Sequence, residues 1–117
     1  MGMIRHHAIV VTSFSLEEAK QARGIALQVF GDRVSGLVGP VTNGYVSFFI
    51  APDGSKEFWP ESDQGDRNRS LFMGRLRESK FMGRAVEVAF GENGPYMVTG
   101  SVGDAYAEAD QAAKGGE

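Results

Sequence analysis

The dipeptide Asn43-Gly44 is the feature that most constrains how this chain can fold. It separates two β-rich runs, over residues 34–41 and 45–51. A two-residue hairpin turn needs positive φ at both central residues, and Asn and Gly adopt that conformation most readily. Pro40 has no backbone N–H to donate to a neighbouring strand, so the first run belongs at a sheet edge. The sequence therefore predicts a hairpin with one edge strand.

A helix is predicted on the N-terminal side of this hairpin. Residues 8–13 form a short β-rich run that predicts the first strand. Ser15 and Glu18 then have the spacing of a capping box, and alanines and larger apolar residues recur behind them at helical spacing. Gly31 stands where a C-cap glycine belongs. The first helix is therefore predicted over residues 16–30, packed closely against the sheet by its many alanines.

A second helix is predicted on the C-terminal side of the hairpin. Residues 52–54, Pro-Asp-Gly, form a turn. A short return strand is expected over residues 56–59, before a proline ends it. Ser62 or Asp63 is then predicted to cap a helix over residues 64–80.

The complete order of elements predicts the fold class. Strands are expected over residues 85–90 and 96–102, which gives the order β-α-β-β-α-β-β. This is the split βαβ, ferredoxin-like pattern with one extra strand. We therefore predict an α+β fold with an antiparallel sheet and two helices on one face. Residues 1–103 form this single domain, and residues 104–117 form an acidic, alanine-rich tail that is either a short helix or disordered.

The chain lacks the residue constellations of common enzymes and metal sites. It has no cysteine, which excludes disulfides, thiolate nucleophiles and cysteine zinc sites. His6 and His7 are neighbours on a predicted strand and point to opposite sides, so they do not chelate one metal. The acidic residues between positions 53 and 66 do not follow the EF-hand spacing. We predict no catalytic residues, no metal and no cofactor.

No apolar run is long enough for a signal-peptide core or a membrane span. We therefore expect a cytoplasmic protein without membrane contact.

Positive charge is concentrated in one segment of an otherwise acidic chain. The formal net charge is −3, whereas residues 66–84 carry six basic and two acidic side chains, a net of +4. Leu71 and Phe72 lie on the predicted apolar stripe of this helix, and arginines stand on either side of it. Arginine forks bind phosphate or carboxylate through paired hydrogen bonds. The residues that we expect to bind an anionic partner are Arg67, Arg69, Arg75 and Arg77.

Three aromatic residues complete the predicted binding site. Trp59 is the only tryptophan in the chain. It stands just before the basic helix, where it is either a lid on the core or a binding anchor. Tyr45 and Phe49 share one face of their predicted strand, where they contact a ligand or pack against a partner subunit or the tail.

Residues 43–72, NGYVSFFIAPDGSKEFWPESDQGDRNRSLF, resemble a segment of a family of small bacteriophage and prophage proteins. In that family a strand, a PDGSKE turn, an aromatic residue and a Gly-Asp pair leading into an arginine-containing helix recur. The resemblance implies a genomic context and no assigned activity. Small phage proteins without catalysis often bind and block a host function, including host defence.

These features favour a small, non-catalytic binding protein that inhibits a host function. It would sequester a nucleotide-like signal or dock on a host protein, with the arginines meeting negative charge and the aromatic residues stacking. The predicted sheet edges, at Pro40 and residues 96–102, favour homo-oligomers. Two alternatives are a nucleic-acid-binding module that uses the basic second helix and a structural or assembly protein of a virion.

Overall fold

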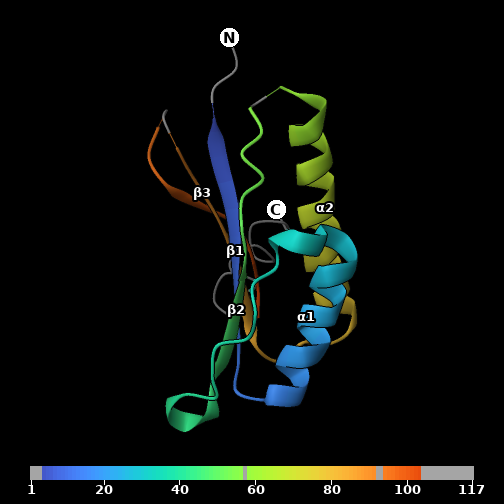
Figure 1. Cartoon of the computed structure of the whole chain (residues 1–117), viewed down its shortest axis with the longest axis vertical. Coiled ribbons are helices and arrows are strands. Elements are labelled where there is room, and N and C mark those ends of the chain that lie inside the picture. The colour runs from blue at the N-terminus through green and yellow to red at the C-terminus, as the bar shows by residue number, and fades with distance from the viewer. Residues whose placement is uncertain (1–3, 57, 92–93, 104–117) are drawn as a thin grey trace, which may run out of the picture.

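The chain folds into a four-stranded antiparallel sheet with two helices on one face (Figure 1). The computed structural model describes residues 4–56, 58–91 and 94–103, and the predicted tail lies outside these residues. Because these residues form two α-helices and an antiparallel sheet, the α+β class is confirmed. In chain order, the strands and α-helices are β1 (Arg5–Ser13), α1 (Leu16–Phe30), β2 (Val46–Ile50), α2 (Pro60–Glu78), β3 (Arg84–Gly91) and β4 (Met97–Val102).

Strand β1 lies in the middle of the sheet, whose order is β2-β1-β3-β4. Its register sets Val10 opposite Phe49 of β2 and opposite Val86 of β3. Neighbouring residues of β1 point to opposite faces of the sheet, and their burial shows it. Val11 is 1% exposed beneath the helices, whereas Val10 is 41% exposed on the other face. The core therefore lies between the helices and one face of the sheet.

The predicted bounds of α1 are confirmed. Ser15 is the N-cap, and its side chain accepts a hydrogen bond from the Glu18 backbone N–H. The Glu18 carboxylate does not reach back to the Ser15 N–H as a complete capping box would. It accepts instead from the Ser13 hydroxyl (2.9 Å) and from the Met82 N–H (3.2 Å), which follows α2. Gly31 ends the helix at φ 60°, a conformation that glycine adopts without strain.

Residues 34–41 do not form the predicted edge strand. Val34 and Val38 each make one isolated bridge to β2, and the ladder goes no further. Gly39 has φ 114° and Pro40 cannot donate a hydrogen bond, so the segment does not stay extended beside β2. The turn itself is as predicted, because the residues of the Asn-Gly pair have φ 61° and 79°. In the part of the chain that the structure describes, the order is therefore β-α-β-α-β-β.

Helix α2 begins earlier than predicted. Trp59 is its N-cap residue and Pro60 occupies the first helical turn, where the missing N–H of proline removes no helical hydrogen bond. The prediction that Ser62 or Asp63 caps this helix is therefore wrong. The predicted return strand is also wrong for the described part of residues 56–59, where Lys56 makes only an isolated bridge to Ile4.

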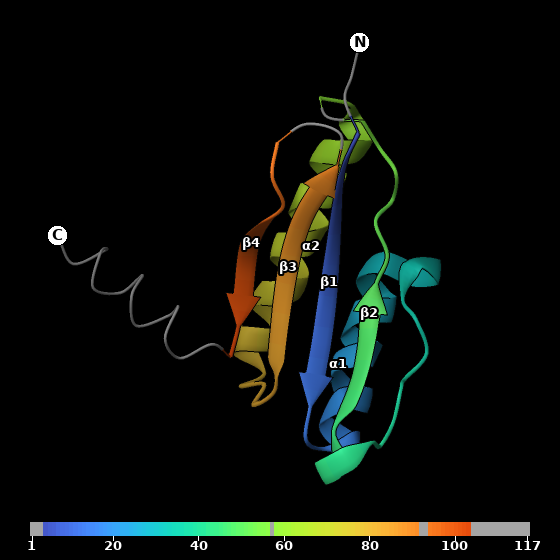
Figure 2. The same cartoon turned by 90° about the vertical axis from the view of Figure 1, so that its left-hand side faces the viewer.

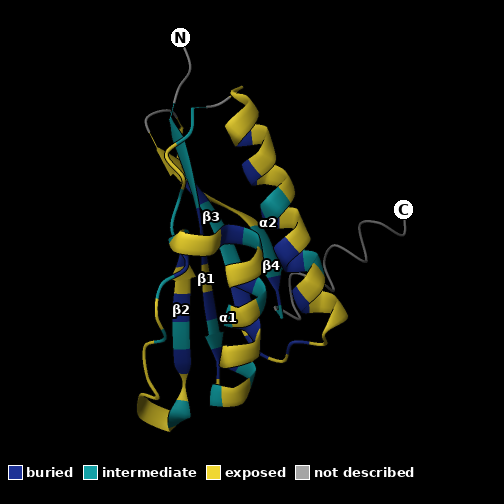
Figure 3. Cartoon of the chain, turned by 45° about the vertical axis from the view of Figure 1, so that its right-hand side comes forward, coloured by how far each residue is buried: buried dark blue, intermediate teal, exposed yellow. Residues whose placement is uncertain are grey.

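The sheet has one covered face and one open face. Figure 3 shows buried residues along the sides of both helices that meet the sheet, and exposed residues on their outer sides. Figure 2 views the other face, where no described helix or strand lies in front of the four strands. We call this the open face, and from the alternation and the register it comprises His6, Ala8, Val10, Thr12, Ser47, Phe49, Arg84, Val86, Val88, Phe90, Val98 and Ser101.

Candidate functional site

A polar cavity of about 470 Å³ lies between the turn after β2 and the first turns of α2. Its volume is in the range of small-molecule binding sites. The turn supplies one wall, the start of α2 supplies another, and Arg33 reaches in from the short 3₁₀ turn after α1. We call this the Trp59 cavity, and it is lined by Arg33, Asp53, Gly54, Ser55, Trp59, Glu61, Gln64, Gly65 and Asn68.

Arg33 and Asp53 form a fixed ion pair in the wall of the Trp59 cavity. Their closest atoms, Nη1 and Oδ2, are 4.0 Å apart, and Arg33 Nη1 also donates to the Ala51 carbonyl at 3.1 Å. The guanidinium stacks 5.2 Å from the centre of the Phe30 ring. Burial lowers the pKa of Arg33, partly offset by Asp53. Because its backbone contact and its stacking fix it, this cation is preorganised.

The Asp53 carboxylate is held in its charged form. Burial, the largest single influence, would by itself raise its pKa, but hydrogen bonds from the Ser55 hydroxyl (2.7 Å) and the Ser55 N–H (2.9 Å) act in the opposite direction. The positive charges of Arg33 and Arg69 add to the same effect, and the pKa is lowered. The cavity therefore presents a cation and an anion side by side at neutral pH.

Two exposed aromatic residues lie at the start of α2. Trp59 lines the cavity with its side chain 45% exposed, and Lys56 Nζ lies 5.5 Å from its ring centre. Phe58 is 90% exposed and has φ 72°. Positive φ in a bulky residue is a strained conformation, and such strain concentrates at functional sites. Phe58 and Trp59 are thus two neighbouring, solvent-exposed aromatic residues at the cavity.

Side-chain amides continue the cavity wall along α2. Gln64 Nε2 donates to Asn68 Oδ1 at 2.9 Å, and Arg67 Nη2 donates to Gln64 Oε1 at 2.9 Å. Gln64 and Asn68 line the cavity, so Arg67 is attached to its rim through Gln64. Amides can accept and donate hydrogen bonds, which suits recognition of a heterocyclic ring edge.

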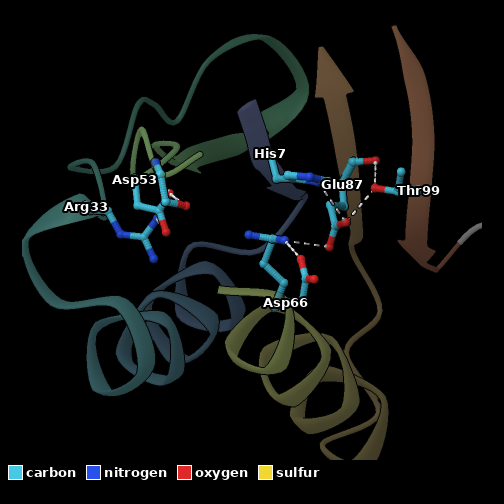
Figure 4. A network of polar contacts seen from close by, with 8 residues as sticks. His7, Arg33, Asp53, Asp66, Glu87 and Thr99 are labelled. Carbon is cyan, nitrogen blue, oxygen red and sulfur yellow. Dashed lines mark hydrogen bonds and ion pairs between the residues drawn. The ribbon is translucent and has the colours of Figure 1, made fainter. Parts of the chain in front are cut away.

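Arg69 points into the protein and not into solvent. Its side chain is 8% exposed and pairs with Asp66, one helical turn away on α2, and with Glu87 on β3, at 3.5 Å from Nε to Oε1 (Figure 4). Gly65 makes room for it, because a Cβ at Gly65 would lie 3.0 Å from Arg69 Nη1 and 3.2 Å from Asp53 Oδ2. Arg69 therefore stands between the cavity and the sheet.

Glu87 is the centre of a partly buried polar cluster on the covered face. Its carboxylate lies 3.7 Å from His7 Nδ1 and accepts a hydrogen bond from the Thr99 hydroxyl. Burial would raise its pKa, but the contact with His7, the hydrogen bond from Thr99 and the charge of Arg69 together outweigh burial and lower the pKa. Glu87 is thus an anion at neutral pH, held by β1, β4 and α2.

The seven residues that the sequence predicts as one binding site do not lie together in the structure. Trp59 lines the cavity and Arg67 lies at its rim, whereas Arg69 is buried. Arg75 and Arg77 lie in the last turn of α2, where they donate to the Gln28 side chain (3.4 Å) and the Ser101 carbonyl (3.1 Å). Tyr45 and Phe49 are 45% and 43% exposed, and Phe49 lies on the open face, across the sheet from both helices.

Two cavity residues, Arg33 and Asp53, were missed as binding residues. Asp53 was assigned to a turn, and that turn is indeed what positions it. Arg33 follows the C-cap of α1, and no local pattern links it to a turn 20 residues further along the chain. The bridge between Val34 and Ile50 and the hydrogen bond from the Ala51 N–H to the Arg33 carbonyl (2.9 Å) bring the two together.

Comparisons with protein-family models, with curated proteins and with solved structures found no match. Within the described residues, no helix is long and apolar enough to span a membrane. A search of the same residues for three or more His, Asp or Glu side chains placed to hold a metal ion found none.

Proposed function

We propose that this protein is a non-catalytic binding protein whose ligand is nucleotide-like and occupies the Trp59 cavity. The observation that carries the proposal is the convergence of one exposed aromatic ring, one preorganised cation and several hydrogen-bonding side chains on a single cavity. Binding sites for small molecules combine these features. The cavity also contains Trp59, which the sequence selected as an anchor.

Each wall of the cavity suits one part of such a ligand. Trp59 offers a ring on which a base can stack. Asp53, Gln64 and Asn68 offer acceptors and donors for a base edge or for ribose hydroxyls. Arg33 offers a guanidinium for a phosphate. Because the carboxylates of Asp53 and Glu61 both line the cavity, we propose a ligand of low negative charge, such as a monophosphate, in preference to a triphosphate.

The biological role that we propose is the one that the resemblance implies: inhibition of a host function by sequestering such a signal. Docking on a host protein is the alternative within this role. The alternative of a nucleic-acid-binding module loses support from the position of Arg69, since this arginine is buried and its charge is matched by Asp66 and Glu87. The alternative of a virion structural or assembly protein requires symmetric self-association.

We also propose that the sheet is of the ferredoxin-like type, with residues 34–41 in place of its second strand. The order β2-β1-β3-β4, antiparallel throughout, supports this. The two isolated bridges from Val34 and Val38 to β2 support it further. Strand β4 is then the extra strand.

The experiment uses the intrinsic fluorescence of Trp59, the single tryptophan. Native mass spectrometry of freshly purified protein first shows any retained adduct of nucleotide mass. Fluorescence titration with AMP, GMP, CMP and UMP should then quench Trp59, because stacking places a base on its ring. Calorimetry with Trp59→Ala should show affinity reduced at least about tenfold.

Arg75→Ala is the matched control, since Arg75 is an exposed arginine of the same helix that lies away from the cavity. It should bind as the unmodified protein does. Equal losses in both variants, or no adduct and no quenching by any of the four nucleotides, would overturn the proposal.

A further inference from the structure

The open face presents apolar side chains from all four strands in continuous rows. Opposite residues of paired strands lie side by side, so Phe49, Val10 and Val86 form one row across β2, β1 and β3. Val88 and Val98 form a second row across β3 and β4. Phe49, Val10 and Val98 are 43%, 41% and 63% exposed. The chain therefore keeps a four-stranded apolar surface in contact with solvent.

This apolar surface is not flat, because it contains two hollows. A hollow of about 400 Å³ lies over β1, β3 and β4, and another of about 570 Å³ lies between β2 and the segment around Leu37. Val10 lines both hollows. A face with both projecting side chains and hollows is what a self-complementary, two-fold interface requires.

The charge on the open face is low. At its described positions the permanent charge is that of Arg84, the first residue of β3 and thus at the rim. His6 stacks against Phe90 with ring centres 5.2 Å apart. Two identical copies of this face therefore meet without bringing permanent charges into the centre of the contact, where unpaired charge would be costly.

We infer that the open face of the sheet binds the open face of a second copy of this chain. The two sheets then pack face to face at the usual spacing of about 10 Å. Phe49, Val10 and Val86 form the centre of the contact. The interface lies on the side of the sheet opposite α2 and the Trp59 cavity, so both cavities of the dimer stay accessible.

The size of the face fits a dimer of modest affinity. Four strands at about 4.8 Å and six residues at about 3.3 Å give a projected area of roughly 400 Å² for each copy. Side-chain relief raises the accessible area, and two copies together bury on the order of 1,000 Å², at the lower end of specific interfaces. An apolar patch of this extent on a monomer is itself at the upper end of what soluble proteins expose.

The first test is mass measured by light scattering across a range of concentrations. The chain has a mass of 12.6 kDa, so a dimer has twice that mass. Phe49→Lys places a charge at the centre of the contact and should raise the dimer dissociation constant at least about 30-fold. Val98→Lys is a second variant at a more exposed position. Leu71→Lys, at a 46% exposed position of α2, is the matched control and should still dimerise.

The second test identifies the occupant of the face. The chain has no cysteine, so Ser101→Cys carries a single thiol on the open face and Ser70→Cys a single thiol on the exposed side of α2. Maleimide labelling of the first should slow as protein concentration rises, whereas labelling of the second should not. Circular dichroism checks that each variant is folded.

Three results would overturn the inference. A monomer at every concentration contradicts it directly. A dimer that Phe49→Lys and Val98→Lys leave intact would place the interface elsewhere, for example at the edges formed by β2 and β4. Protection of the Ser101→Cys thiol that does not depend on concentration would assign the face to a segment of the same chain, such as residues 104–117.

Discussion

The two faces of the sheet distribute charge and apolar surface in opposite ways. The covered face includes ion-paired groups, Arg69 and Glu87, beneath α2. The open face exposes valines and phenylalanines to solvent. Burying charge costs free energy even when the charges are paired, and exposing a broad apolar surface favours association. The covered face therefore uses charge to hold α2 to the sheet, whereas the open face is better explained by association.

The comparison also separates two kinds of arginine on one helix. Arg67 and Arg69 are two residues apart on α2, yet one is at the cavity rim and the other is 7% exposed. Their surroundings decide their roles: Arg67 donates to a surface amide, whereas Arg69 pairs with the exposed carboxylate of Asp66 and the largely buried carboxylate of Glu87. The number of basic residues in a segment of the sequence therefore overstates the positive charge that the folded segment offers to a partner.

The largest expected effect comes from breaking the ion pair between Arg69 and Glu87. Arg69→Ala leaves Glu87 without its guanidinium partner and should lower the free energy of unfolding by about 3 kcal/mol. Urea unfolding followed by circular dichroism measures the change. Arg67→Ala is the control and should change stability by less than about 0.5 kcal/mol. If the two variants are equally stable, the cluster does not hold α2 to the sheet.

A smaller effect should distinguish the two faces directly, at neighbouring residues of β1. Val11→Ala removes two methyl groups from the core and should cost about 2 kcal/mol. Val10→Ala makes the same chemical change on the open face and should cost less than about 1 kcal/mol. Unfolding is measured at low protein concentration, where association does not contribute. Equal costs would mean that the open face is buried within the monomer.

The smallest expected effect is a dependence of stability on pH. The pKa of Glu87 in the folded protein lies below its ordinary value of 4.5, so the folded state favours the carboxylate. Its contribution is complete above about pH 4.5 and is lost as the pH falls through the lower, folded pKa. Asp53, whose pKa is also lowered, acts with the same sign.

Glu87→Gln tests this dependence, because glutamine has a similar shape and does not titrate. The variant should lose less stability between pH 5 and pH 3, within the range in which carboxylates titrate, than the unmodified protein does. Chemical unfolding at several pH values gives the comparison. A variant with the same acid dependence would assign the titration to other carboxylates.

The fold could be predicted where local sequence decides the structure. Ser15 and Gly31 mark both ends of α1, because capping is a property of the residues themselves. The start of α2 was predicted too late because Pro60 was read as an ending, although proline suits the first turn of a helix. The missing strand over residues 34–41 depends on Gly39 and Pro40, whose effect on pairing with β2 is not a local property.

The candidate site could be predicted only in part. Trp59 lines the cavity and Arg67 lies at its rim, and their binding of a ligand stays a prediction. The spacing of residues along α2 does predict the burial of Arg69. Spacings of three and four residues place it on one stripe of α2, and the residues of that stripe are all buried: Ser62, Gly65, Arg69, Phe72 and Leu76. Leu71 lies off this stripe and is 46% exposed, so its predicted place on the apolar side is wrong.

Glu18 links the start of α1 to the loop after α2. Its carboxylate accepts hydrogen bonds from Ser13, just before α1, and from the backbone of Met82, 64 residues further along the chain. Local opening of the first turn of α1 therefore releases the loop that leads into β3, and opening of that loop removes a partner from α1. The first turn of α1 and the loop after α2 therefore unfold together as one cooperative unit, although neither lies in the core.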